Sequence, residues 1–196
     1  MEGSNFVANE KGGLIKYTGS DKNVIIPSAF KYIDEKAFYN CDFIESIILP
    51  MGLWGIYESA FEGCTSLREI IIPYPTNWIE KRAFARCKNL KKIVIKRECV
   101  KLGVELFSGG AEEFEIEFHG DTETFKRMTK AEVSKEVVSS GDYHHPTSSH
   151  WECHEIVTYG HVFSDVNEGR FTCKVHCKDG ELVFNAQTNE TWTEQR

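Results

Sequence analysis

The chain has 196 residues, of which 41% are apolar, so it can bury a hydrophobic core and is not expected to be disordered. Lys and Arg number 23 against 30 Asp and Glu, a formal charge of −7 that, without a basic tract, argues against nucleic acid as a partner. No apolar run approaches the roughly 18 residues of a membrane span, and the first residues lack the features of a secretory signal. We therefore expect no membrane association, and the absence of a signal favours a cytoplasmic location.

Residues 1–22 are expected to form an N-terminal lead-in, because a period of 23 residues governs the chain from residue 23 onward. Positions that share this period are called a column below. Three columns define the pattern: an apolar column at Val24, Ile47, Ile70, Ile93 and Ile116, a phenylalanine column at Phe38, Phe61, Phe84 and Phe107, and a cysteine column at Cys41, Cys64 and Cys87. The coincidence of several columns identifies a repeat protein.

Each repeat contains a short β-branched run, such as residues 69–72, which is typical of a strand of about four residues. A unit of 23 residues cannot bury its own apolar face, so neighbouring units must stack and share one core. We predict a mainly β solenoid with short helical or 3-10 turns, whose array covers residues 23–119 in about four repeats. The phenylalanine column should form an internal stack, and the cysteine column should be a row of small buried side chains rather than disulfides.

The repeat pattern resembles a known family. Residues 56–70 read Ile-x-x-x-Ala-Phe-x-x-Cys-x-x-Leu-x-x-Ile, which is similar to the BspA-like, or treponemal, leucine-rich repeats. Residues 14–27 look like the usual start of such an array, and residues 120–128 resemble its closing segment, with Phe125 where the family has Trp. Residues 175–180 are similar to a hairpin found after these arrays. The resemblance implies a leucine-rich-repeat solenoid that binds other macromolecules and has no catalytic activity.

Side chains alternate along a strand, so one column of each strand should face outward on the concave sheet. That column consists of Ile25, Ile48, Ile71 and Val94, and the flanking column includes Glu69 and Lys92. An exposed apolar stripe with a polar rim is typical of an interaction site. Two alternatives remain open: β-branched residues simply pair well across strands, or the C-terminal segment folds over the stripe.

Several aromatic residues follow the predicted strands, including Trp54, Tyr74 and Trp78. Aromatic side chains are enriched at binding anchors, so these three are candidate contact residues. They could equally cover the ends of short strands. We include them, with the outward stripe, in the predicted binding surface.

The sequence changes character after the array. Residues 120–140 are predicted to form a capping helix, because Phe125, Met128, Val133 and Val137 fit an amphipathic pattern. Residues 141–169 are polar and rich in His, and we expect a loop region. Residues 170–196 are predicted to form a C-terminal β-hairpin, since an alternating strand is followed by Lys-Asp-Gly.

The tail carries the residues that a zinc site would use: His144, His145, His150, Cys153, His154, His161, Cys173, His176 and Cys177. On an extended strand Cys173 and Cys177 lie about 13 Å apart, too far for one ion. His150 and His154 could share a helix face, but they would need a third ligand from elsewhere. We expect no bound metal, no cofactor and no catalytic residue.

These observations predict a non-catalytic interaction module that binds a protein partner through the concave sheet of a short solenoid. One alternative is a self-associating structural protein, such as a homodimer that uses the same patch twice. The other is a metal-binding sensor that uses the His and Cys residues of the tail.

Overall fold

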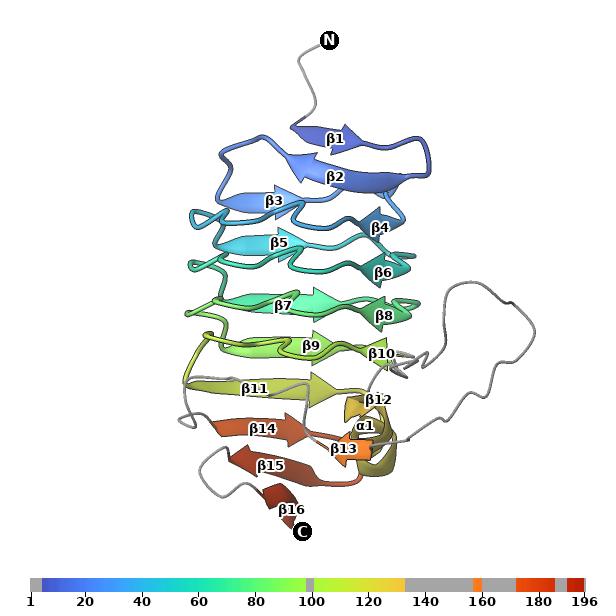
Figure 1. Cartoon of the computed structure of the whole chain (residues 1–196), viewed down its shortest axis with the longest axis vertical. Coiled ribbons are helices and arrows are strands. Elements are labelled where there is room, and N and C mark those ends of the chain that lie inside the picture. The colour runs from blue at the N-terminus through green and yellow to red at the C-terminus, as the bar shows by residue number, and fades with distance from the viewer. Residues whose placement is uncertain (1–4, 98–100, 133–156, 160–171, 186–189, 196) are drawn as a thin grey trace, which may run out of the picture.

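The computed structural model describes residues 5–97, 101–132, 157–159, 172–185 and 190–195. Its strands form two ladders that run side by side along the long axis, with β1 and β16 at opposite ends (Figure 1). This is the mainly β repeat solenoid that the 23-residue period predicted.

The first ladder, called the long sheet, consists of the pair β3–β5 followed by the six-stranded sheet β7-β9-β11-β14-β15-β16, and β5 lies against β7. Its strands are β3 Asn23–Ile25, β5 Ser46–Ile48, β7 Glu69–Ile72, β9 Lys92–Ile95, β11 Glu113–Phe118, β14 Thr172–His176, β15 Glu181–Asn185 and β16 Glu190–Gln195. β3 pairs in parallel with β5, and β7, β9, β11 and β14 pair in parallel in that order, whereas β15 and β16 are antiparallel to their neighbours.

The second sheet has the order β1-β2-β4-β6-β8-β10. Its strands are β1 Phe6–Ala8, β2 Gly13–Tyr17, β4 Tyr32–Ile33, β6 Gly55–Ile56, β8 Trp78–Ile79 and β10 Lys101–Leu102. The antiparallel pair β1–β2 occupies the N-terminal end of this sheet, within the predicted lead-in, and the other strands pair in parallel.

The strand register follows directly from the period. Ile47 is the partner of Val24 on β3, and Ile93 is the partner of both Ile70 and Ile116. Because paired residues are one repeat apart, residues of one column lie next to each other along the sheet, about 4.8 Å apart. Each sequence column therefore becomes a row of equivalent side chains in the structure.

The phenylalanine column forms the predicted stack in the core. The ring centroids of Phe38 and Phe61 are 5.0 Å apart, and the distances to Phe84 and Phe107 continue at 5.6 and 6.1 Å, with interplanar angles of 6–17°. Tyr17 extends the stack at its N-terminal end, 5.2 Å from Phe38. All of these rings are buried, so the stack runs through the centre of the solenoid.

The turns beside this stack use two positive-φ positions in each repeat. The first column has φ values of 52–57° at Lys36, Ser59, Arg82 and Glu105, and the second has values of 56–78° at Asn40, Gly63, Arg86 and Gly109. Left-handed backbone favours Gly or Asn, which fill three positions of the second column. Arg82 and Glu105 of the first column take part in the ion-pair network described below.

The C-terminal cap combines a helix with further strands. Helix α1 (Thr122–Thr129) buries Phe125 and Met128. The ring centroid of Phe125 lies 5.3 Å from that of Phe118 on β11, the last strand of the array. The prediction of one helix over residues 120–140 is corrected here: α1 ends at Thr129, and β12 (Lys130–Glu132) pairs with β13 (Val157–Tyr159). Residues 133–140 lie outside the described part of the chain.

The C-terminal hairpin extends the long sheet. Strand β14 pairs in parallel with β11, Glu113 being the partner of Thr172 and Glu117 that of His176, so it continues the long sheet by one further strand. Cys173 and Val175 are buried, as the alternation along residues 170–177 predicted, and Leu182 of β15 is buried as well. Most of the predicted His-rich loop, residues 141–169, lies outside the described residues.

Candidate interaction surfaces

The outward face of the long sheet carries an exposed row of isoleucines. Ile25, Ile48 and Ile71 are 67%, 59% and 45% exposed, while the alternating residues beside them face the core. Ile25 and Ile48 are direct partners in the β3–β5 register. We call these three residues the isoleucine stripe, and they are the part of the predicted outward column that the structure exposes.

The prediction that Val94 is exposed is wrong, because its side chain is only 3% exposed. Val94 lies between Ile71 and Glu117 in the register of the long sheet. The Lys92 ammonium lies 3.1 Å from the Glu117 carboxylate, so an ion pair joins β9 to β11 next to Val94. The stripe therefore ends at Ile71.

The flanking column is polar, as predicted. Glu69 and Lys92 are exposed and are direct partners in the β7–β9 register. At the other end of this column, the Ser46 hydroxyl lies 2.6 Å from the Asn23 side-chain oxygen. The isoleucine stripe thus has a row of hydrogen-bonding and charged groups along one side.

The loops after the strands extend the apolar surface beyond the sheet. Met51 and Tyr74 belong to one column and are 75% and 51% exposed. The next residue of this column is Arg97, whose guanidinium lies 4.7 Å from the centre of the Tyr74 ring. Sequence reasoning identified Tyr74 but missed Met51, although the period that links the two residues could have found it.

A second surface lies on the outward side of the second sheet. Four aromatic residues gather there: Tyr32, Trp54, Tyr57 and Trp78. Tyr32 contacts the other three rings at centroid distances of 6.0–6.4 Å, and Tyr57 lies 6.2 Å from Trp78. Trp54 is 47% exposed, and the other three rings are partly exposed. We call this group the aromatic cluster.

Gly55 explains how the cluster forms. It is the direct partner of both Tyr32 and Trp78 in the parallel ladder, so it stands between them. A Cβ atom at Gly55 would collide with the Trp78 indole, because that ring leans into the space above the glycine. Tyr32 and Trp78 consequently stack across it, 6.4 Å apart, although they lie two strands apart. The sequence analysis identified the tryptophans but missed the role of this glycine.

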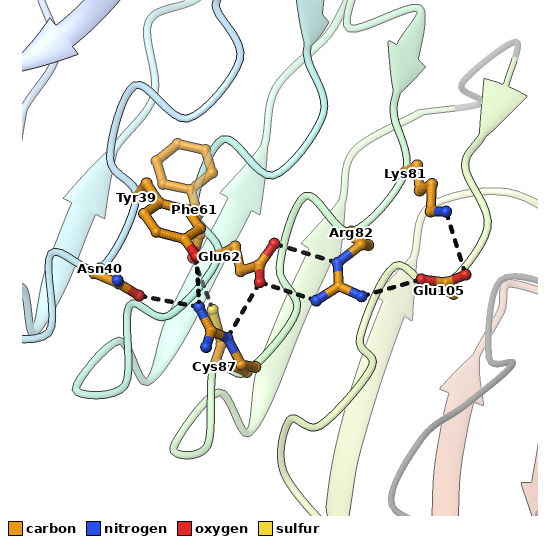
Figure 2. Close-up of polar contacts among 9 residues, drawn as sticks. Tyr39, Asn40, Phe61, Glu62, Lys81, Arg82, Cys87 and Glu105 are labelled. Carbon is orange, nitrogen blue, oxygen red and sulfur yellow. Dashed lines mark hydrogen bonds and ion pairs between the residues drawn. The ribbon is translucent and has the colours of Figure 1, made fainter.

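An ion-pair network holds the turns of neighbouring repeats together (Figure 2). The buried carboxylate of Glu62 lies 2.9 Å from the Nη2 atom of Arg82 and 3.1 Å from Nε of Arg86. Arg82 also reaches Glu105 at 3.3 Å, and Glu105 lies 3.4 Å from Lys81. The network links three consecutive repeats.

Burial by itself would raise the pKa of the Glu62 carboxyl. Hydrogen bonds from Arg82 and Ser59, together with the charges of Arg82 and Arg86, outweigh that effect and hold the pKa below its ordinary value. A depressed pKa with every acceptor engaged is typical of a structural ion pair. We therefore assign the network to stability rather than to chemistry.

The cysteine column is structural as well. Cys64 and Cys87 are buried, and their thiols donate hydrogen bonds of 3.2 Å to the carbonyl oxygens of Phe38 and Phe61 in the preceding repeat. Burial raises the pKa of Cys64 and raises that of Cys87 to about 12. Thiols protonated at neutral pH are poor nucleophiles and poor metal ligands.

Within the described residues, no group of three or more His, Cys, Asp or Glu side chains is placed to hold a metal ion. Cys173 is buried and Cys177 is half-buried, whereas His176 contacts Glu181 at 2.9 Å on the outward side. The other tail candidates, His144, His145, His150, Cys153, His154 and His161, lie outside the described residues. In the part of the chain that the structure describes, no helix has the length and apolar character needed to cross a membrane.

Comparison with known proteins agrees with this architecture. The model of the BspA type leucine-rich repeat region matches residues 15–130 in six copies, which is more than half of the chain. The chain therefore belongs to the BspA-type leucine-rich-repeat family.

Solved structures show the same fold. A leucine-rich-repeat protein of T. pallidum, TpLRR, is 28% identical with a TM-score of 0.51, and the match covers 56% of each chain. The pneumococcal vaccine antigen PcpA is 21% identical with a TM-score of 0.54, and the match covers 61% of this chain and 36% of PcpA. The chain thus spans about half of TpLRR and about a third of PcpA. No curated protein sequence matches the chain.

Proposed function

We propose that this protein is a non-catalytic interaction module that binds a protein partner through the isoleucine stripe of the long sheet. The observation that carries the proposal is the exposure of three large apolar side chains, Ile25, Ile48 and Ile71, in one row of a regular sheet. Contiguous exposed apolar surface with a polar margin is characteristic of interaction sites.

Cross-strand pairing alone is a weaker explanation of the stripe. Thr is also β-branched and suits a strand, but it would leave a hydroxyl rather than a hydrocarbon surface in contact with water. Met51 and Tyr74, which are not on strands, add exposed apolar area beyond the stripe. The whole surface favours burial against a partner, which would remove this area from water.

The polar column beside the stripe suits the margin of such an interface. Interfaces combine an apolar centre with a polar rim that supplies specificity. Asn23, Ser46, Glu69 and Lys92 run along one side of the isoleucines and present amide, hydroxyl, carboxylate and ammonium groups in order. A partner that matches this order could fix its position along the solenoid.

The family and the buried thiols support a role without catalysis. Leucine-rich-repeat proteins commonly act as protein-interaction modules and are generally not enzymes. The thiols of Cys64 and Cys87 are occupied in backbone hydrogen bonds, and Glu62 is engaged by two arginines. These potentially reactive groups therefore have structural roles.

The test is capture of partners from a lysate of the source organism by the full chain and by the triple variant Ile25→Thr, Ile48→Thr, Ile71→Thr. Thr retains β propensity, so the variant should fold with an unchanged circular dichroism spectrum. The control is Val7→Thr, Ile15→Thr, which changes two β-branched residues, each 40% exposed, at the N-terminal end of the second sheet.

The proposal predicts that a partner held by the wild type and the control is lost from the triple variant, with purified partner binding at least 10-fold more weakly. Equal binding of that partner by the folded triple variant would remove the stripe from the interface. If the retained protein is a second copy of this chain, and light scattering shows a dimer that the triple variant lacks, then the stripe serves self-association instead.

A further inference from the structure

The aromatic cluster is bordered by carboxylates placed by the same repeat geometry. Asp34, Tyr57 and Glu80 form one column, and the backbone N–H of each donates to a carbonyl of the preceding repeat. Because Ile33, Ile56 and Ile79 point into the core, the residues on either side of them point outward. Tyr57 therefore stands between two acidic side chains on the surface.

Nearby contacts hold both carboxylates in place. The Asn9 amide donates to Asp34 Oδ2 at 2.6 Å, and the Glu58 backbone N–H donates to Glu80 Oε2 at 3.2 Å. Burial and then the charges of Glu80 and Asp34 raise the pKa of the Tyr57 hydroxyl, which agrees with their proximity to this ring. Fixed carboxylates next to exposed ring faces create a region of negative potential.

Rings of this kind attract cations, because the face of an aromatic ring carries negative charge. The protein already makes such contacts elsewhere: Arg97 lies over Tyr74 at 4.7 Å, and Arg86 lies over Tyr39 at 5.6 Å. In the aromatic cluster, Trp54 is the most exposed residue. Tyr57 contacts Tyr32, which in turn contacts Trp54, and the charges of Asp34 and Glu80 act on Tyr57, so a guanidinium stacked on the Tyr57 ring would lie close to both carboxylates. Arg combines both contacts, since its planar group stacks on a ring and donates to carboxylates.

We propose that the aromatic cluster and its two carboxylates form a second binding site, separate from the isoleucine stripe, that takes an arginine-bearing peptide segment of a partner. A wholly apolar segment fits less well, because it would bury Asp34 and Glu80 without compensation. An anionic ligand is repelled by both carboxylates and by the net charge of −7. This site does not depend on the function proposed for the stripe.

The test is an NMR titration of the full chain, labelled with ¹⁵N at the tryptophan indoles, with the capped peptide Gly-Arg-Gly-Arg-Gly. The Trp54→Phe variant assigns the Trp54 indole signal among the four tryptophans of the chain. We expect this signal to shift on titration and the Trp54→Ala variant to bind at least 10-fold more weakly. The same peptide with citrulline in place of arginine, which is isosteric but neutral, should also bind at least 10-fold more weakly.

Two charge variants separate a specific site from general attraction to an acidic protein. In Asp34→Asn, Glu80→Gln the amide oxygens can still accept the bonds from Asn9 and Glu58, so the fold should be retained. Glu112→Gln, Glu113→Gln removes the same charge from two exposed residues at the start of β11. The first variant should weaken binding at least fivefold and the second less than twofold.

If both double variants weaken peptide binding equally, the attraction depends only on the net charge of the protein, and the proposed site is wrong. Equal affinity for the citrulline peptide would show that the ligand need not be cationic, which also overturns the proposal. No shift of the Trp54 indole at millimolar peptide would do the same. None of these outcomes bears on the isoleucine stripe, which lies on the other sheet.

Discussion

The indole of Trp78 lies directly over Gly55, its partner in the parallel ladder of the second sheet. This contact lets Tyr32 and Trp78 stack at 6.4 Å from opposite sides of the glycine. Glycine usually destabilises a strand, but here its missing side chain leaves the space in which an aromatic surface forms.

The Gly55→Ala variant should lose stability and disturb the aromatic cluster. The added methyl group meets the Trp78 ring, so the expected loss in the free energy of unfolding is about 1–3 kcal/mol, which urea denaturation can measure. Near-ultraviolet circular dichroism should report the displaced ring. In a Trp78→Ala background the same change should have a much smaller effect, since the colliding group is gone. Equal effects in both backgrounds would contradict the contact.

Replacement of Glu62 should affect stability in a pH-dependent way. The Glu62→Gln variant loses the charge that Arg82 and Arg86 contact at 2.9 and 3.1 Å, and we expect a loss of about 1–3 kcal/mol at pH 7. The folded pKa lies below the ordinary value of 4.5, so the stabilisation is complete well above pH 4.5 and decreases as the pH falls through the folded pKa.

Thermal unfolding of the wild type and of Glu62→Gln between pH 3 and 8 can check this expectation. The difference between their melting temperatures should be largest at neutral pH and should disappear in acid. A difference that stays constant over this range would show that the pKa of Glu62 is not depressed by folding. Glu10→Gln, at an exposed position outside the ion-pair network, serves as the control.

The cysteine column should respond to mutation according to burial. Cys64→Ala removes a thiol that fills the core and donates to the Phe38 carbonyl, so we expect a loss of about 1 kcal/mol or more in the free energy of unfolding. Cys41→Ala, at the half-buried end of the same column, should be milder. In the native protein at pH 7, maleimide should label Cys64 and Cys87 only on unfolding. Rapid native labelling of either would contradict their burial.

Thr76 offers a stabilising substitution. Its side chain is buried, and its hydroxyl has no hydrogen-bond partner among the described residues. Phe30 and Leu53 occupy the same column in the two preceding repeats, so the site suits an apolar side chain. Thr76→Val, which keeps the shape, should raise the free energy of unfolding by about 1 kcal/mol. A loss of stability in denaturant titration would mean that the hydroxyl is satisfied. Thr18→Val is the contrasting control, because the exposed Thr18 hydroxyl donates to the Asn5 carbonyl at 3.3 Å and its removal should not stabilise the fold.

The period of 23 residues was sufficient to predict the array, because equal spacing forces equivalent residues into adjacent positions of a parallel sheet. The stacking of Phe38 on Phe61, the burial of Cys64 and Cys87, and the outward direction of Ile25, Ile48 and Ile71 all follow from that arithmetic together with strand alternation. These features are local to one repeat and its neighbours.

Other features were decided only by tertiary structure. Val94 has the same alternation as Ile71 but is buried, beside the ion pair that joins Lys92 to Glu117 on the next strand. Strand β14 pairs with β11 although a long segment separates them in the sequence, and the 23-residue repeat does not predict this register. The sequence alone thus determined which residues recur and which side they face, since these depend on spacing. Exposure and partner choice were decided by the contacts that long side chains and distant segments make once the chain has folded.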